Sequence, residues 1–320
     1  MNKKEIVYIS CWFLKLFLMQ KRTLFFFIIL ICISCTKGNT PPELDIDPDF
    51  VRGKFINDWV YQVFPNGADG FDSALFSMWI PSNTSPRAIL VISPGSGSTS
   101  LGDVNLKEWQ DYAIQENLAL IGLQIKPNAS ATVSSNMFAL LYALKELTTK
   151  NNIEGVNDLP FLFTGFSAGG GLSYDYAFEN KNRTIAYANI KGFMTEVNSG
   201  ETTVPGLIIV GEQEGNQRIE FIKKAFYSQR KNENVTCFAI EPNSGHSIDN
   251  SNNLVRAFFT SVLKKRLINN ELIEITENEV ILANYDNKET YSFANYPYDK
   301  EKAVCLIDTD FKNFWLNFIK

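Results

Sequence analysis

The sequence predicts an α/β fold, in which helices cover both faces of a mostly parallel sheet. From residue 88 onward, short and fully apolar runs alternate with amphipathic stretches of helix length. Such apolar runs are typical of parallel strands that are buried on both faces. One of them leads directly into a glycine-rich junction, FLFTGFSAGGG at 161–171, which places a serine between glycines. With 320 residues, 45% of them hydrophobic, the chain can form one large core.

The predicted sheet has eight strands and begins with an antiparallel hairpin around the glycine-rich turn NGADG. The later strands alternate with helices, which indicates parallel pairing. The predicted strands are 57–65, 74–81, 88–93, 118–125, 159–165, 184–193, 205–211 and 234–242. The predicted helices are 106–116, 136–150, 168–178, 217–229 and 251–267.

The helix predicted over 136–150 shows the periodicity most clearly. Its apolar residues recur three or four positions apart, and Ser135 is placed to cap its N-terminus. The periodic residues are Met137, Leu140, Leu141, Leu144 and Leu147.

The α/β pattern predicts one domain over 51–267 and a C-terminal flank over 268–320. The flank contains a possible hairpin at 271–285, an irregular tyrosine-containing segment, and a final apolar helix within 308–320. It is too short and too polar to form a core of its own, so we expect it to pack on the larger domain.

The N-terminal segment has the features of a secretory signal of the bacterial lipoprotein type. Residues 1–34 include a basic start after Met19 and a short apolar run that ends before Cys35. We expect Cys35 to carry the lipid, and Met19 is a possible true start of translation. Residues 35–50 are polar and contain proline, as expected of a tether. The alternative is an uncleaved membrane anchor. The signal predicts an exported protein, lipid-anchored in the periplasm or at the outer membrane or cell surface of a bacterium.

Charge and composition exclude several classes of function. Removal of residues 1–34 would remove five basic residues and one acidic residue, leaving 25 basic and 34 acidic residues and a formal charge of −9. Nucleic acid is therefore not an expected partner, because binding phosphates requires a basic surface. We also expect a monomer.

Few metal-binding side chains are available. The chain has a single histidine and no paired-cysteine spacing, so the sequence predicts no metal site and no cofactor. Besides Cys35, two cysteines remain after removal of the signal, Cys237 and Cys305. These two cysteines form either one disulfide or two free thiols. Cys237 lies in a predicted buried strand, where a free thiol is common.

Ser167 is the candidate nucleophile. In Gly165-Phe166-Ser167-Ala168-Gly169 it follows a buried strand and opens a helix. A sharp turn at such a junction projects the hydroxyl out of the sheet, and the small flanking residues let strand and helix approach closely. The alternative is a glycine-rich connection without chemistry.

A serine hydroxyl needs a base, and His246 is the one histidine of the chain. It follows the strand 234–242, so it lies at the sheet edge where Ser167 also emerges. A carboxylate between the two in the chain would hold the imidazole tautomer. Glu212 and Glu214, in the loop after 205–211, are the candidates, and Glu196 is a further one.

The strand pattern, the elbow, the acid loop and the terminal histidine resemble the α/β-hydrolase superfamily over about 57–267. The short connection between 184–193 and 205–211, the SPGSGS loop and the tryptophan in the final segment are most similar to secreted esterases of the polyhydroxyalkanoate-depolymerase and feruloyl-esterase type. The resemblance implies an α/β-hydrolase fold without a large lid.

The resemblance also implies roles for individual residues. The triad acid of such proteins commonly lies three residues after the glycine that ends its strand, which selects Glu214 by counting from Gly211. The oxyanion would be held by two backbone N–H groups, those of Ser96 in the SPGSGS loop and of Ala168. A flexible glycine-serine turn is the alternative for the loop.

These features predict a serine-dependent carboxylic-ester hydrolase that acts through an acyl-enzyme. An open cleft would admit a bulky or polymer-linked ester, such as an acylated polysaccharide. Two alternatives remain. One is a catalytically degenerate hydrolase-fold lipoprotein that binds glycan or polymer, and the other is a peptidase of the same fold.

Overall fold

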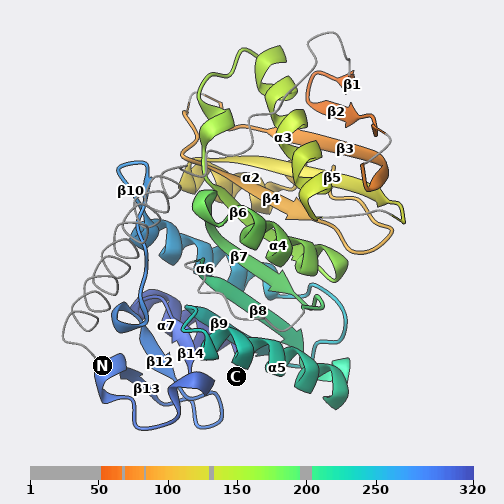
Figure 1. Cartoon of the computed structure of the whole chain (residues 1–320). Helices are drawn as coiled ribbons and strands as arrows, with labels where there is room; N and C mark the ends of the chain where they lie inside the picture. Colours follow the sequence, from red (N-terminus) through yellow and green to blue (C-terminus); the bar gives the residue numbers. More distant parts are fainter. Residues whose placement is uncertain (1–51, 67–68, 83, 130–132, 195–203) are drawn as a thin grey trace, which may run out of the picture. The chain divides into compact units, whose positions relative to one another are not determined.

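The computed structural model describes residues 52–66, 69–82, 84–129, 133–194 and 204–320. The predicted signal, the tether and Cys35 lie outside these residues. Nine strands form the principal sheet of the described part, in the order β1-β2-β3-β5-β4-β6-β7-β8-β9 (Figure 1). They are β1 (Gly53–Asn57), β2 (Val60–Val63), β3 (Phe71–Trp79), β4 (Ala88–Ser93), β5 (Leu118–Pro127), β6 (Phe161–Phe166), β7 (Thr184–Ile190), β8 (Gly206–Gly211) and β9 (Thr236–Glu241).

The ninth strand corrects the prediction of eight. The run predicted as one strand over 57–65 contributes to two strands, because the chain reverses at Asn57 and β1 pairs with β2 in antiparallel orientation. The predicted entry hairpin is the β2–β3 pair.

The topology of the sheet is that of the α/β-hydrolase fold. β3 pairs with β5 in antiparallel orientation, whereas β4 to β9 are joined by parallel pairing. After β4 the chain passes to β5 on one side and then to β6 on the other side of β4. The strand order thus reverses at β4, and the loops after β4 and β6 leave the sheet side by side. In open α/β sheets this reversal is where ligands bind.

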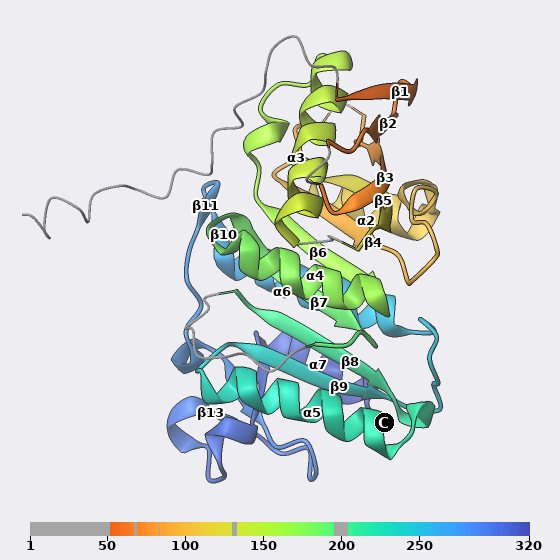
Figure 2. The same cartoon turned by 45° about the vertical axis from the view of Figure 1, so that its right-hand side comes forward.

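Helices cover both faces of the sheet (Figure 1, Figure 2). The first face carries α3 (Val133–Lys150), α4 (Ala168–Glu179) and α5 (Asn216–Lys231). The second carries α2 (Lys107–Glu116) and α6 (Ser251–Arg266), which are tied together by a hydrogen bond from Thr260 to Glu116. Strands β4 to β9 are buried along most of their length, as the continuous apolar runs require, whereas the edge strand β1 is mostly exposed.

Two local predictions were wrong. Ser135 lies inside the first turn of α3 instead of capping it, because backbone hydrogen bonds and not the apolar pattern set helix ends. The hairpin predicted over 271–285 does not form. Its first arm, β11 (Glu271–Leu272), pairs with β10 (Leu267–Ile268) through a two-residue Asn-Asn turn with positive φ angles, and a turn of this kind closes a hairpin locally.

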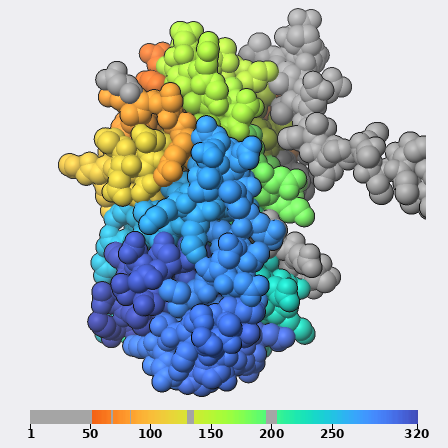
Figure 3. Space-filling model, turned by 90° about the vertical axis from the view of Figure 1, so that its left-hand side faces the viewer, coloured from red at the N-terminus to blue at the C-terminus, as the bar shows by residue number. Residues whose placement is uncertain are grey.

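The C-terminal residues form a small sheet and a helix beside β9. β12 (Ile281–Ala283) pairs with β13 (Thr290–Ser292) and β14 (Val304–Leu306), and α7 (Thr309–Phe318) follows. Asp308 caps α7 by accepting the Phe311 N–H. The buried Trp315 donates its indole N–H to the Phe238 carbonyl of β9 at 2.9 Å. Figure 3 shows these residues, in blue to dark blue, as one contiguous surface.

The C-terminal segment is held to α5 by Arg230, whose side chain is fully buried. Its guanidinium pairs with Glu277 and donates to the carbonyl groups of Ala303 and Lys300.

Cys237 on β9 and Cys305 on β14 are buried free thiols, and burial raises the pKa of each. Among the described residues, no helix combines the length and the apolar character that a membrane span requires.

Gly169→Ala is expected to destabilise the fold, because a Cβ at Gly169 would lie 2.3 Å from the Ser93 carbonyl oxygen. Overpacking against backbone costs about 1–3 kcal/mol. Gly102→Ala is the control, because Gly102 has φ −82° and open space around its Cβ position. Urea denaturation measures both variants, and equal midpoints would contradict the close approach of helix and loop.

Candidate active site

Ser167 occupies a strained elbow between β6 and α4. Its φ of 55° and ψ of −120° lie in a region that residues with a side chain rarely adopt. The Ser167 N–H donates to the Ile190 carbonyl of β7 at 2.8 Å, which anchors the turn to the neighbouring strand. A Cβ at Gly165 would lie 2.4 Å from the Gly169 carbonyl oxygen, so only glycine allows strand and helix to meet this closely.

His246 reaches Ser167 from the loop that follows β9. Its Nε2 lies 2.9 Å from Ser167 Oγ, within hydrogen-bond distance. The Phe166 ring packs against the imidazole, with ring centroids 4.9 Å apart. The histidine side chain is 44% exposed, so the reacting groups are open to solvent.

Glu214 is the carboxylate that contacts the histidine. Its Oε1 lies 2.5 Å from His246 Nδ1. The fold thus brings together three residues that are far apart in the sequence: His246 lies 79 positions after Ser167 and 32 positions after Glu214. The Glu214 side chain is only 1% exposed, and its Oε2 accepts the Gly211 N–H at 2.8 Å. This arrangement fixes Nδ1 as the protonated nitrogen, because a carboxylate can only accept.

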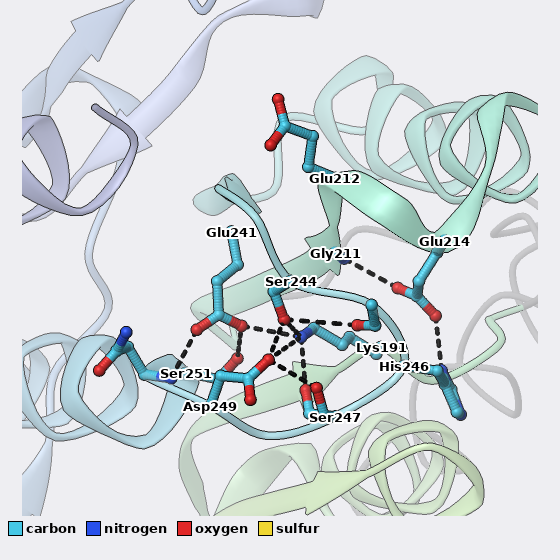
Figure 4. A network of polar contacts seen from close by, with 12 residues as sticks. Lys191, Gly211, Glu212, Glu214, Glu241, Ser244, His246, Ser247, Asp249 and Ser251 are labelled. Atoms are coloured by element: carbon cyan, nitrogen blue, oxygen red, sulfur yellow. Dashed lines mark hydrogen bonds and ion pairs between the residues drawn. The ribbon is translucent and has the colours of Figure 1, made fainter.

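Glu212 has a different partner and points away from the imidazole (Figure 4). Its Oε2 accepts the Asn243 N–H at 2.8 Å, and the neighbouring Gln213 N–H donates to the Ser244 carbonyl at 2.8 Å. These two bonds join the loop that carries the acid to the loop that carries the histidine. Glu196 lies outside the described residues.

Two cationic residues near the site, Arg218 and Lys191, were not predicted from the sequence. Arg218 Nε lies 2.6 Å from Glu214 Oε1, and the guanidinium also donates to the Lys191 carbonyl and stacks on the Phe193 ring at 4.2 Å. Arg218 stands four residues after Glu214, a spacing that could have indicated the pair. Lys191 follows β7 and is fully buried. Nothing in the motif IKGF distinguishes it from a solvated lysine.

One predicted oxyanion donor, Ser96, lies in the loop after β4, and the other, Ala168, lies at the start of α4 after β6. Ala168 is the first residue of α4, so its N–H is one of those that a helix cannot satisfy internally. Ser96 lies in an exposed turn that is closed by a hydrogen bond from the Ser98 N–H to the Gly95 carbonyl. No contact recorded for the described residues links Ser96 to Ser167, and its role stays a prediction.

A cavity of about 410 Å³ lies beside the elbow. It is lined by Phe166, by Pro94 and Gly95 of the loop after β4, and by Ile248 of the histidine loop. Its charged lining residues are all acidic: Asp103, Glu108 and Asp249.

In the part of the chain that the structure describes, no three His, Cys, Asp or Glu side chains are grouped as metal ligands would be.

Comparison with protein-family models and with curated proteins found no match. Solved structures of similar fold include a thermostable esterase, at 13% identity and a TM-score of 0.41. That alignment covers 54% of this chain and 51% of the esterase, so the chain spans about half of that protein. A dienelactone hydrolase from Anabaena variabilis aligns at 17% identity and a TM-score of 0.42, over 60% of this chain and 92% of that one.

A phospholipase/carboxylesterase from Dyadobacter fermentans aligns at 15% identity and a TM-score of 0.41, over 59% of this chain and 95% of that one. Such distant similarities concern the fold alone. The fold is defined by this chain's own strand order, and the chemistry of the site by its own side chains.

Proposed function

We propose that the protein is a serine-dependent carboxylic-ester hydrolase that acts through an acyl-enzyme. The observation that carries this proposal is the chain of contacts from Ser167 Oγ to His246 Nε2, at 2.9 Å, and from His246 Nδ1 to Glu214, at 2.5 Å. Nucleophile, base and orienting acid thus stand in the order that activation of a serine requires. The strained φ of Ser167 adds support, because it projects the hydroxyl from the sheet edge.

In the proposed mechanism, Ser167 Oγ attacks the ester carbonyl carbon while His246 Nε2 takes the hydroxyl proton. Glu214 stabilises the resulting imidazolium, and the backbone N–H groups of Ala168 and Ser96 stabilise the oxyanion. The bond to the alcohol then breaks, and His246 returns the proton to the leaving oxygen. Water then attacks the acyl-enzyme carbonyl carbon and passes a proton to His246. The bond from that carbon to Ser167 Oγ breaks, His246 returns the proton to Oγ, and the carboxylic acid is released.

The substrate class that we propose is a bulky or polymer-linked neutral ester, such as an acylated polysaccharide. Supporting this, His246 is 44% exposed and only 15 residues connect β7 to β8, too few for a lid domain. The cavity beside the elbow is lined by acidic but no basic residues, which disfavours an anionic group there.

A fluorophosphonate probe tests the reaction class, because it reacts with an activated serine. We expect labelling of Ser167, detected by peptide mass spectrometry, and hydrolysis of p-nitrophenyl acyl esters in preference to aminoacyl anilides. A folded protein that is not labelled would favour a glycan-binding role instead. Faster cleavage of the anilides would favour a peptidase. A panel of acyl chain lengths and hydroxycinnamoyl esters then identifies the acyl group.

We further propose that the protein is exported and anchored by a lipid on Cys35. The support is the sequence from Met19 to Cys35, with its basic start and short apolar run, and the polar residues that follow. Intact mass spectrometry of membrane-extracted protein is expected to show a chain that begins at diacylated Cys35. A chain that retains residues 1–34, or an unmodified N-terminus elsewhere, would contradict this.

A further inference from the structure

Lys191 is a fully buried lysine at the edge of the candidate active site. It directly follows β7, its φ is 55°, and its N–H donates to the Ile209 carbonyl of β8 at 2.8 Å. Its side chain is 0% exposed. An isolated ammonium group in such a place would be strongly destabilising, so its partners explain why it is there.

Those partners belong to β9 and to the loop that carries His246 (Figure 4). Lys191 Nζ lies 2.8 Å from Glu241 Oε2, at the end of β9, and donates to the Ser244 hydroxyl and the Ser247 carbonyl. Asp249 lies 4.0 Å away. The ammonium therefore contacts the loop two residues before His246 and one residue after it.

The same loop is held at its far end by Glu241. Its Oε1 accepts the Asn250 N–H at 2.6 Å, and its Oε2 accepts the Ser251 hydroxyl at 2.7 Å. Asp249 accepts hydrogen bonds from the Ser244 and Ser247 hydroxyls, which lower the pKa of its carboxyl group. Lys191 is thus the cationic centre of a network that closes the loop from Glu241 to Ser251.

Lys191 also reaches the acid side of the site through its backbone. Its carbonyl accepts a hydrogen bond from Arg218, which pairs with Glu214. One residue therefore contacts the histidine loop through its side chain and the partner of the acid through its main chain. His246 itself is exposed, and of the contacts described here only those to Ser167, Glu214 and Phe166 involve its ring. Its placement depends on the loop.

We propose that Lys191 is a positioning residue, whose buried ammonium holds the loop 242–250 so that His246 stands between Ser167 and Glu214. This inference rests on the proposed hydrolase function. A displacement of about 1 Å in a reacting group can cost about 10²-fold in rate. The competing explanation is that Lys191 merely balances the buried charge of Glu241 and serves stability alone.

Two variants separate these explanations in the full-length protein. Lys191→Met keeps the aliphatic stem but leaves Glu241 without its cation. Lys191→Met/Glu241→Gln also removes that unpaired charge, yet Ser244 and Ser247 still lack the ammonium. We expect kcat on p-nitrophenyl acetate to fall about 100-fold in both variants, with KM changed less than about threefold. We expect thermal stability to recover at least in part in the double variant.

Arg230→Met is the matched control, because Arg230 is also a fully buried cation with a carboxylate partner, Glu277, and several carbonyl acceptors. It holds the C-terminal residues instead of the histidine loop. We expect this variant to lose stability while kcat per folded molecule stays unchanged.

The single histidine allows a readout that does not depend on turnover. In protein labelled with ¹⁵N-histidine, the nitrogen shifts of His246 report its tautomer. We expect the Nδ1–H form in the wild type and in Arg230→Met, and a mixture with the Nε2–H form in both Lys191 variants. If the double variant regains wild-type kcat, or if both Lys191 variants keep the wild-type tautomer, the positioning role is wrong. If the Lys191 variants show this change of tautomer but the wild type hydrolyses no ester, the proposed function fails while the positioning role stands.

Discussion

Ser167→Ala and His246→Ala are each expected to lower kcat for ester hydrolysis by roughly 10⁶-fold. Ser167 supplies the attacking oxygen, and His246 Nε2, 2.9 Å away, is the base that can take its proton. No second histidine exists in the chain to replace it. Removing either residue disables the unit as a whole, so the double variant is expected to lose little more than each single one.

Steady-state kinetics on p-nitrophenyl esters measures the loss, and circular dichroism checks the fold. Ser73→Ala, a serine on β3, is the control for serine loss and is expected to keep wild-type kcat. Because Ser167 is in a strained backbone conformation at the sheet edge and His246 is exposed, neither substitution removes core packing. Retention of most activity in a folded His246→Ala protein would show that the proposed triad is wrong.

Glu214→Gln is expected to lower kcat about 10⁴-fold, as loss of the orienting carboxylate does in a well-studied serine protease. In the structure, Glu214 Oε1 lies 2.5 Å from His246 Nδ1 and accepts a hydrogen bond from the Nδ1–H group. The amide of glutamine can instead donate to Nδ1, which favours the tautomer that carries its proton on Nε2. That tautomer cannot accept the serine proton.

Glu212→Gln is the matched control, two residues away in the same loop. Its carboxylate accepts the Asn243 N–H, a role that the amide oxygen of glutamine can retain, so we expect less than a tenfold loss. Thermal denaturation accompanies the kinetics, because Glu214→Gln also leaves Arg218 without its anionic partner. The opposite ranking of the two variants would assign the acid to Glu212, and two mild effects would indicate an acid elsewhere in the chain.

The order of strands and helices could be read from the sequence because each element carries its own local signal. Strands buried on both faces are continuous apolar runs, and amphipathic helices repeat every three to four residues. Ser167 could be predicted for the same reason, since an elbow needs small residues at fixed offsets from the serine. His246 followed from elimination, as the one histidine of the chain.

Pairing partners and polar networks were decided only by the tertiary structure. The additional strand β1 and the β10–β11 pair depend on which backbone segments meet, and a short local turn prevailed over the longer predicted hairpin. The contact of Glu214 with His246, and the direction in which Glu212 points, depend on how two loops far apart in the sequence are joined.

Lys191 marks the limit of the sequence most clearly. A lysine after a strand is usually solvated, and no periodicity or spacing indicates otherwise. Its burial depends on residues that lie 50 to 56 positions further along the chain. Glu241 supplies an anion, and Ser244 and Ser247 supply hydrogen-bond acceptors around the ammonium. Local residue patterns determined the elements and the candidate nucleophile and base. Long-range electrostatics and hydrogen bonding, which have no local signature, decided how those groups are held in place.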